Sequence, residues 1–304
     1  MVISRLFGYV NDILRECRVN YQDTSRVMLK LMYITKRPEV AQIAEKAGVD
    51  WIFVDMEFIG KDSRQGGLDS VQNHHTVEDV ANIKAAVSKA NVLVRVNPIH
   101  EKMSDYPSSE DEINSVIEAG ADIVMLPFFK TVAEVERFVK IVDDRAKVCL
   151  LVETPEAAKL LEQIVAVSGI DMIHLGLNDM HLALGMKFMF ELLTDGSVDK
   201  WISIIKGAGI KYGFGGLASL DGGAVPGRMI LKEHYRLGSQ MVIVSRSFCN
   251  TDKMTNIDEV RDVFIKGISD IRKMECEMSA MTQEDFRANH EAVCEAVREI
   301  VKGY

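Results

Sequence analysis

Polar residues that could carry chemistry lie in or directly after five short apolar runs of the sequence. They are Asp55 and Glu57 in WIFVDME, Arg95 and Asn97 in VLVRVN, Glu153 in VCLLVE, Asn178 and Asp179 after MIHLG, and Ser245 and Arg246 after MVIV. In a barrel of parallel strands the chemistry sits at the carboxyl ends of the strands. If these runs are strands of one closed sheet, their polar residues converge on one mouth.

Two carboxylates, Glu153 and Asp179, follow neighbouring apolar runs. Carboxylate oxygens are preferred ligands of Mg²⁺ and Mn²⁺, whose octahedral shell is completed by substrate oxygens and water. A cation held in this way could act as a Lewis acid. The pair therefore indicates a Mg²⁺ or Mn²⁺ site, and a purely structural network of charges is the alternative interpretation.

Arg95 lies in the middle of VLVRVN, where a charge needs an anionic partner because an unpaired buried charge is costly. Its forked guanidinium suits the carboxylate of a substrate. The alternative is an internal ion pair with Asp55 or Glu57. The residues alone leave both interpretations open.

Three histidines can each be interpreted as functional or as purely structural residues. His74 and His75 end the polar segment 60–75, from which they could reach the mouth as acid/base groups, although a histidine in a surface loop is more often simply solvated. His174 lies within MIHLG and is interpreted as a barrel residue rather than a ligand.

Eight apolar, β-branched-rich runs alternate with stretches of helical spacing such as PEVAQIAEKAG. The runs are 26–34, 51–57, 90–97, 123–127, 145–153, 172–176, 209–216 and 241–245. Runs that are apolar on both faces are typical of parallel strands covered by helices. Eight repeats, with no GxGxxG or GxxxxGK[ST] phosphate loop, predict an α/β fold of the (β/α)8 TIM-barrel type.

Three segments fall outside this repeat: residues 1–25, the polar insertion 60–75 after the second run, and the C-terminal residues 254–304. We expect residues 1–25 to form a short helical lead, 26–253 to form the barrel, and 254–304 to form two amphipathic helices, the second opening at Thr282. An extra helix on a barrel often packs on a partner subunit. We therefore expect a homo-oligomer, and exchange of the C-terminal helices between subunits is a hypothesis.

Composition limits the classes of partner. The chain has 304 residues, 47% hydrophobic and 27% charged, with a net charge of -9. A negative protein is poorly suited to nucleic acid or to anionic membranes. The sequence has neither the apolar span of a membrane helix nor a signal-peptide core, so the cytoplasm is the expected compartment. The five cysteines are odd in number and widely spaced, and we expect ordinary thiols.

Several motifs in register resemble the HpcH/HpaI aldolase and citrate lyase family of metal-dependent barrel lyases. The resemblance covers about residues 26–250. It rests on AEKAGVDWIFVDMEF, VRVNP, AGADIVMLPFFKTVAEVERFV, LLVETPEAAKLLEQI and GIDMIHLGLNDMHLALG, in that order. Several motifs in the same order are far more specific than any one of them.

The resemblance implies a role for each matching residue. Glu153 and Asp179 would bind the divalent cation, and Arg95 would contact the oxygens of a 2-keto acid and help to stabilise its enolate. Asp55 and Glu57 match acidic residues beside the site. The resemblance also implies a homo-oligomer that is a trimer or a hexamer.

The substrate carboxylate would lie against backbone. By the same resemblance, the segment Gly176, Leu177 and Asn178 would approach this carboxylate, and Pro127 is placed among the substrate-binding residues.

One departure from the family is specific. In the aldolase branch an acidic residue at the end of the second strand is followed by the acid/base His, but here Glu57 is followed by Phe58, which cannot move a proton. His74 or His75 is the hypothetical replacement.

Three functions follow from the resemblance and this departure. The leading expectation is a divalent-metal aldolase that joins or cleaves a 2-keto acid such as pyruvate and an aldehyde. The alternatives are a citrate-lyase-like enzyme acting on an acyl or CoA thioester, and a non-catalytic barrel.

Overall fold

The structure is a computed structural model that describes residues 28–60, 75–251 and 253–304. The predicted helical lead, 1–25, lies outside the described residues. So does most of the segment 60–75, including His74.

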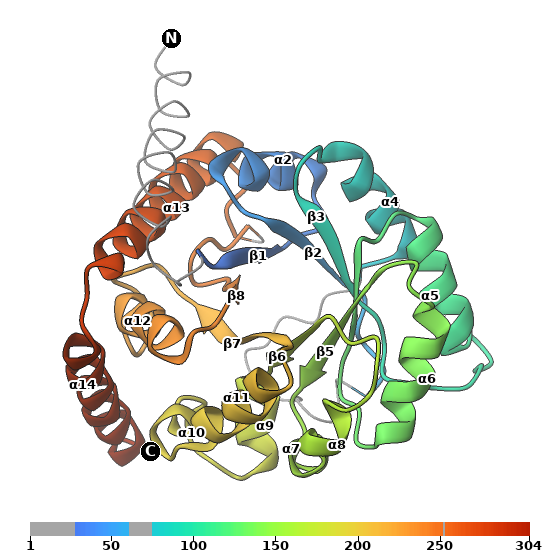
Figure 1. The fold of residues 1–304 in the computed structure, drawn as a ribbon. Coiled ribbons are helices and arrows are strands. Elements are labelled where there is room, and N and C mark those ends of the chain that lie inside the picture. The colour runs from blue at the N-terminus through green and yellow to red at the C-terminus, as the bar shows by residue number, and fades with distance from the viewer. Residues whose placement is uncertain (1–27, 61–74, 252) are drawn as a thin grey trace.

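Eight parallel strands pair in sequence order and close into a barrel, β8 pairing with β1 (Figure 1). The strands are β1 (Lys30–Ile34), β2 (Trp51–Asp55), β3 (Asn91–Arg95), β4 (Ile123–Leu126), β5 (Lys147–Val152), β6 (Met172–Leu175), β7 (Lys211–Leu217) and β8 (Met241–Val244). Seven lie within the predicted runs and β7 extends one residue further. The prediction of a (β/α)8 barrel is confirmed.

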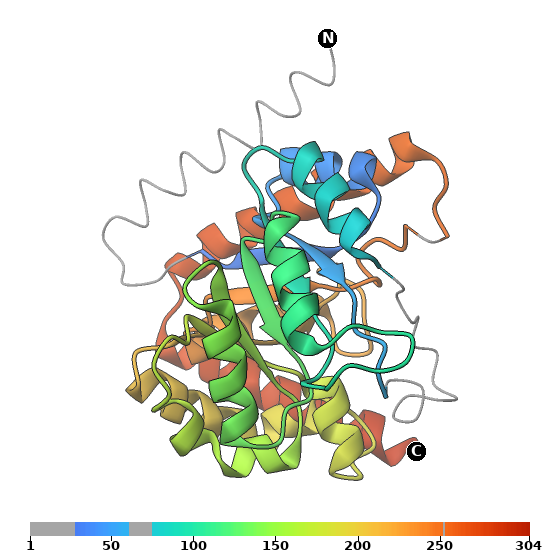
Figure 2. The same ribbon diagram turned by 90° about the vertical axis from the view of Figure 1, so that its right-hand side faces the viewer.

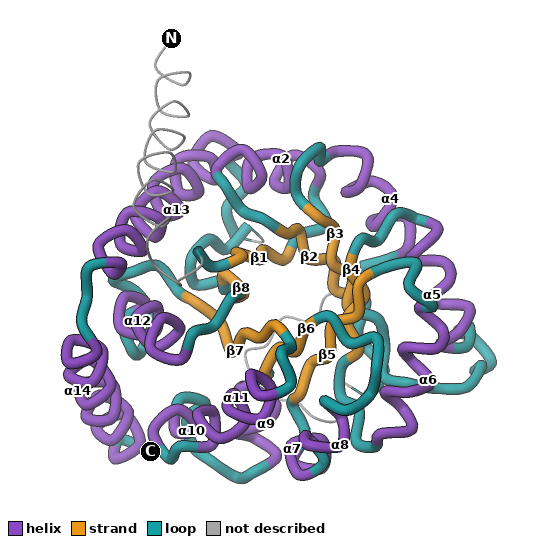
Figure 3. The backbone as a smooth tube through the Cα atoms, in the orientation of Figure 1, coloured by secondary structure: helices purple, strands orange, loops and turns teal. Residues whose placement is uncertain are grey.

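Helices surround the barrel on its outside (Figure 3). They are α2 (Pro38–Ala47), α4 (Val77–Ala86), α5 (Ser109–Glu118), α6 (Val132–Val142), α7 (Pro155–Lys159), α8 (Leu161–Ile164), α9 (Leu177–Ala183), α10 (Glu191–Thr194), α11 (Ser197–Gly207), α12 (Gly227–Leu237), α13 (Ile257–Ser279) and α14 (Gln283–Lys302). At least one helix follows every strand, as the alternation of the sequence predicts.

Local sequence explains where these helices begin and end. Pro38 begins α2, where its missing N–H costs nothing, and Gly48 ends the helix in the left-handed conformation with φ 104°. Thr76 and Asp79 form a capping box at the start of α4. Residues at the ends of these two helices therefore mark where α2 ends and where α4 begins.

The core has two layers, one inside the barrel and one between strands and helices. Alternation along β2 illustrates the division, because Trp51 and Phe53 belong to the inner cluster whereas Ile52 and Val54 belong to the outer one. Asp55 is two residues after Phe53 and therefore also lies on the inner face, at the carboxyl end of the barrel.

The two C-terminal helices pack on the barrel of their own chain. α13 lies beside α2 (Figure 2), and Arg272 of α13 donates hydrogen bonds to the Leu29 carbonyl at 2.9 Å, Glu275 at 2.7 Å and Asp50 at 2.9 Å. α14 packs on α12 and begins at Thr282 with a capping box, as predicted. Exchange of these helices between subunits stays a prediction.

The cysteine prediction is wrong in one place. Cys276 in α13 is disulfide-bonded, whereas Cys149, Cys249 and Cys294 are free thiols. Wide spacing in the sequence does not exclude a disulfide, because folding can bring distant residues together. None of the helices among the described residues is both long enough and apolar enough to cross a membrane.

Candidate active site

Four strands place polar side chains on the inner face of the barrel near its carboxyl end. The inner rows run Trp51, Phe53, Asp55 on β2, Leu93, Arg95 on β3, Cys149, Leu151, Glu153 from β5, and Met172, His174 on β6. Apolar residues fill the positions toward the amino ends of the strands, and polar residues fill the positions at the carboxyl ends. The predicted convergence of Asp55, Arg95 and Glu153 on one mouth follows from this period of two.

Arg95 is the centre of a buried ion-pair cluster. Its Nε and Nη2 donate to the two carboxylate oxygens of Asp55, both at 2.8 Å, and its Nη1 lies 3.2 Å from Oε2 of Glu57. The guanidinium carbon lies 5.6 Å from the centre of the Phe53 ring. Asp55 and Glu57 are 1% and 0% exposed. The internal ion pair that the sequence offered as an alternative is therefore present.

The ion pairs do not use all of the guanidinium. Burial by itself lowers the pKa of Arg95, but Asp55 and Glu57, with a contribution from Glu153, raise the pKa well above its ordinary value. The two hydrogen bonds to Asp55 use two of the five N–H groups, and the contact of Nη1 with Glu57 is an ion pair. The remaining N–H groups allow Arg95 to contact a substrate oxygen while its own charge stays paired.

Glu153 follows β5 and is 3% exposed. The backbone N–H of Phe128 donates to its Oε1 at 3.0 Å. Phe128 has φ 50°, a left-handed conformation that a bulky residue seldom adopts, and it follows the buried Pro127 at the end of β4. The strained turn thus directs an amide toward the carboxylate.

A glycine is required beside Glu153. A Cβ on Gly176 would lie 2.8 Å from both Cβ and Oε2 of Glu153. Gly176 is also the N-cap of α9, the short helix that carries Asp179, which is 8% exposed. Of the other two predicted residues in this segment, Leu177 packs its side chain in the core and Asn178 is exposed. Only their backbone could therefore serve as predicted.

The chemistry of Glu153 and Asp179 fits a divalent cation. They are buried oxygen donors at the carboxyl ends of the paired strands β5 and β6. Among the described residues no group of three or more His, Cys, Asp or Glu side chains is arranged to hold a metal ion. Magnesium sites commonly use only one or two carboxylates and take their other ligands from water and substrate, so two suffice.

Asn97 organises the segment after β2 and is a residue whose role the sequence did not reveal. It is fully buried, and its Oδ1 accepts hydrogen bonds from the N–H groups of Phe58 and Ile59, both at 2.9 Å. Its Nδ2 donates to Glu112 at 2.8 Å. Asn97 therefore fixes where Phe58 stands, and the polar residue after β3 was the signal that could have found it.

His75 is brought to the end of β2. Its Nδ1 accepts the backbone N–H of Asp55 at 3.0 Å. The carbonyl of Phe53 on β2 accepts a hydrogen bond from the N–H of Thr35, so the backbone of Phe53 faces β1. The N–H of Asp55, two residues later, faces the same side. Because β1 ends at Ile34, this N–H lies beyond the end of β1, where His75 accepts it. With Nδ1 as the acceptor, the proton of the neutral ring resides on Nε2.

His174 lies inside the barrel, 1% exposed, as the sequence predicted. Its Nε2 bonds to the Gly215 carbonyl at 3.0 Å, and its Nδ1 has no hydrogen-bond partner among the described residues. Burial, together with the charge of Arg95, lowers the pKa of His174 to about 4. It is therefore neutral at pH 7.

The fold and the mouth define a class: a (β/α)8 barrel with a buried arginine and carboxylates at the carboxyl ends of its strands, the position of active sites in such barrels. Residues 29–191 match the family model of the HpcH/HpaI aldolase/citrate lyase family. The match spans more than half of the chain, and the protein belongs to this family. Membership supports a function of the lyase or aldolase type.

Solved structures share this fold. An HpcH/HpaI aldolase/citrate lyase family protein from Burkholderia cenocepacia is 17% identical, with TM-score 0.57, over 77% of this chain and 95% of its own. The HpcH/HpaI aldolase from Desulfitobacterium hafniense is 15% identical, with TM-score 0.54, over 81% and 93%.

The citrate synthase SbnG is 18% identical, with TM-score 0.52, over 72% of this chain and 87% of its own. At these identities the likeness concerns the fold alone. A comparison with curated proteins finds no match.

Proposed function

We propose that the protein is a divalent-metal-dependent carbon-carbon lyase that forms or cleaves a 2-keto acid through a pyruvate-type enolate. In the forward direction a methyl carbon of pyruvate loses one proton and bonds to the carbonyl carbon of an aldehyde, whose oxygen gains a proton. No oxidant or reductant is needed. The observation that carries the proposal is the buried cluster of Arg95 with Asp55 and Glu57 beside Glu153.

Arg95 would bind the keto-acid oxygens. A guanidinium whose position is fixed by two carboxylates needs no reorganisation when negative charge develops on a substrate oxygen. Glu153 and Asp179 would hold Mg²⁺ or Mn²⁺, which when bound would supply further stabilisation of that charge. The backbone of Gly176, which is kept free of a side chain by Glu153, would face the substrate carboxylate.

His75 is the described residue best placed to move a proton. Its Nδ1 accepts the backbone N–H of Asp55, whose side chain pairs with Arg95, and an imidazole is a side chain suited to proton transfer near neutral pH. Phe58 stands at the rim with its ring against Tyr106 and supplies no proton. His74 remains the other candidate for this role.

Deuterium exchange into the methyl group of pyruvate tests the proposal without choosing an aldehyde. We expect metal-dependent exchange in D₂O, followed by proton NMR, and its loss with chelator or in Glu153→Gln. His75→Ala and His74→Ala should be compared with His290→Ala, a histidine on α14 far along the chain from the mouth. If both single variants exchange at the wild-type rate, neither histidine is the acid/base.

Two alternatives have distinct outcomes. Metal binding without exchange of pyruvate would favour a lyase acting on an acyl or CoA thioester, which the exchange assay can test with acetyl-CoA. Absence of both metal binding and pyruvate exchange would favour a non-catalytic barrel. We also propose a homo-oligomer, which the mass in solution of the full chain and of a chain ending near residue 275 would test.

A further inference from the structure

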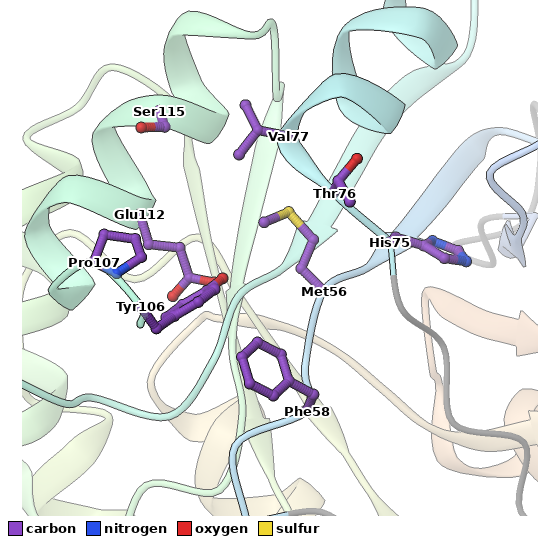
Figure 4. A pocket seen from close by; sticks show the side chains of 9 residues that line it. All are labelled: Met56, Phe58, His75, Thr76, Val77, Tyr106, Pro107, Glu112 and Ser115. Carbon is purple, nitrogen blue, oxygen red and sulfur yellow. The ribbon is translucent and has the colours of Figure 1, made fainter. Parts of the chain in front are cut away.

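A cavity of about 350 Å³ lies at the rim of the barrel between β2, α4 and α5 (Figure 4). Met56 and Phe58 come from the end of β2, Val77 begins α4, and Tyr106 and Pro107 precede α5. A dry cavity of about 150 Å³ is enough to hold benzene. This one has room for a substituted aromatic ring.

Aromatic geometry shapes one wall of the cavity. The rings of Phe58 and Tyr106 meet edge to face, with centres 4.9 Å apart and planes at 84°. The Tyr106 hydroxyl donates to Glu112 at 2.9 Å, and Asn97 holds both Glu112 and the backbone of Phe58. This hydrogen-bonded frame fixes the wall before any ligand arrives, which reduces the entropy lost on binding.

The charge of the lining selects against anions. Among the described residues that line the cavity none is Lys or Arg, and Glu112 is the one carboxylate. Glu112 is 2% exposed and already accepts hydrogen bonds from Asn97 and Tyr106. A carboxylate or phosphate placed beside Glu112 would lose its hydration next to a buried acid, and the described lining residues offer no Lys or Arg to compensate.

The cavity shares residues with the surroundings of the active site. Phe58 is covalently next to Glu57, which pairs with Arg95. His75 also lines the cavity, and its Nδ1 accepts the N–H of Asp55, the other partner of Arg95. A molecule that reacts beside Arg95 could therefore extend a substituent across the rim into this cavity.

We propose that this cavity binds the uncharged aromatic or branched aliphatic substituent of the aldehyde that adds to the keto-acid enolate. The inference rests on the proposed function. The reaction is unchanged, because the new bond still joins the methyl carbon of pyruvate to the aldehyde carbon, with transfer of one proton. The cavity supplies the preference among aldehydes.

Filling the cavity is the direct test. Ser115 on α5 lines it and its hydroxyl donates only to the Asp111 carbonyl one turn earlier, so Ser115→Leu adds apolar volume at a helical position. We expect kcat/KM for benzaldehyde to fall about tenfold or more, with acetaldehyde nearly unaffected. Ser203→Leu, at an exposed site on α11, is the matched control.

Charge discrimination uses a near-isosteric pair of aldehydes. We expect 4-formylbenzamide to be favoured over 4-formylbenzoate by about tenfold or more in kcat/KM. Glu112→Gln, which keeps an oxygen that can accept from Tyr106, should narrow that difference in kcat/KM between the two aldehydes. Equal use of the two aldehydes by the wild-type protein would overturn the assignment.

Two further readouts separate this inference from the proposed function. Benzyl alcohol cannot react, so its binding by saturation-transfer NMR, and loss of binding in Ser115→Leu, reports on the cavity without turnover. The Ser115→Leu protein could retain both normal pyruvate exchange and the wild-type kcat/KM for benzaldehyde. That result would overturn the cavity assignment and leave the proposed function intact. Absence of exchange in the wild-type protein would overturn the proposed function itself.

Discussion

Replacing Arg95 with Met removes a cation that contacts two buried carboxylates, Asp55 and Glu57. Asp55 is 1% exposed, Glu57 is 0% exposed, and the Arg95 side chain is 15% exposed. Breaking a buried pair by deleting one partner costs about 3–5 kcal/mol. Because Arg95 contacts two buried carboxylates, we expect the free energy of unfolding to fall by an amount within that range.

Urea unfolding, followed by the fluorescence of Trp51 and Trp201, measures this loss. Arg95→Lys keeps the charge but loses the two-pronged bond to Asp55, so we expect a loss of about 1–2 kcal/mol. Adding Asp55→Asn to Arg95→Met should restore about 1–3 kcal/mol, because a neutral amide is less costly to bury than a carboxylate that has lost its contacts with Arg95. Lys266→Met, in an exposed ion pair of α13, is the control and should leave the urea midpoint unchanged.

Two results would refute this reasoning. One is an Arg95→Met protein less than about 1 kcal/mol below wild type, which would mean that water or a cation solvates the carboxylates in the folded state. The other is strict additivity of Arg95→Met and Asp55→Asn, since residues in direct contact should couple. Both variants should in addition lose pyruvate exchange.

Three other predictions concern the metal, the glycine and the buried histidines. Mg²⁺ at roughly 100 times its Kd should raise the free energy of unfolding by about 2.7 kcal/mol in the wild type but not in Glu153→Gln, as judged by urea midpoints. Gly176→Ala should weaken Mg²⁺ binding about tenfold or more by calorimetry, because the new Cβ would lie 2.8 Å from Oε2 of Glu153, and unchanged affinity would contradict the packing argument. Burial lowers the pKa of His174 to about 4 and that of His234 to about 3, so in acid only the unfolded chain gains these protons. Stability should therefore be flat above pH 6.5 and fall on the order of 3 kcal/mol per histidine as pH drops toward 4, and His234→Gln should reduce the slope in urea titrations at stepped pH.

The sequence determined the barrel and the end of it that carries the site. Parallel strands covered on both faces require continuous apolar runs, and eight such runs alternate with helical stretches between residues 26 and 245. The period of two along each strand also sets which residues face inward, so the inward direction of Asp55, Arg95 and Glu153 can be predicted by counting residues along each strand. These features are local and repeat along the chain, which is why they can be predicted without coordinates.

Other features depend on contacts between distant segments. The residues alone could not decide whether Arg95 pairs with Asp55 or with a ligand, because Asp55 and a keto-acid ligand both offer a carboxylate. The register of β2 against β3 decides this, since it places Asp55 beside Arg95. The role of Asn97 was hidden for the same reason, since it binds backbone N–H groups about 40 residues earlier in the chain.

The rim cavity was likewise decided only by tertiary structure. Phe58, taken from the sequence as a lost histidine, became a wall once Tyr106 packed against its ring. Local patterns fix which side of a strand or helix a residue occupies, but the free energy of a cavity or a buried ion pair depends on which other elements close over it. The sequence therefore determined the barrel and its reactive end, and the packing of the segments after β2 and β3 decided the partners of Arg95 and the shape of the pocket beside it.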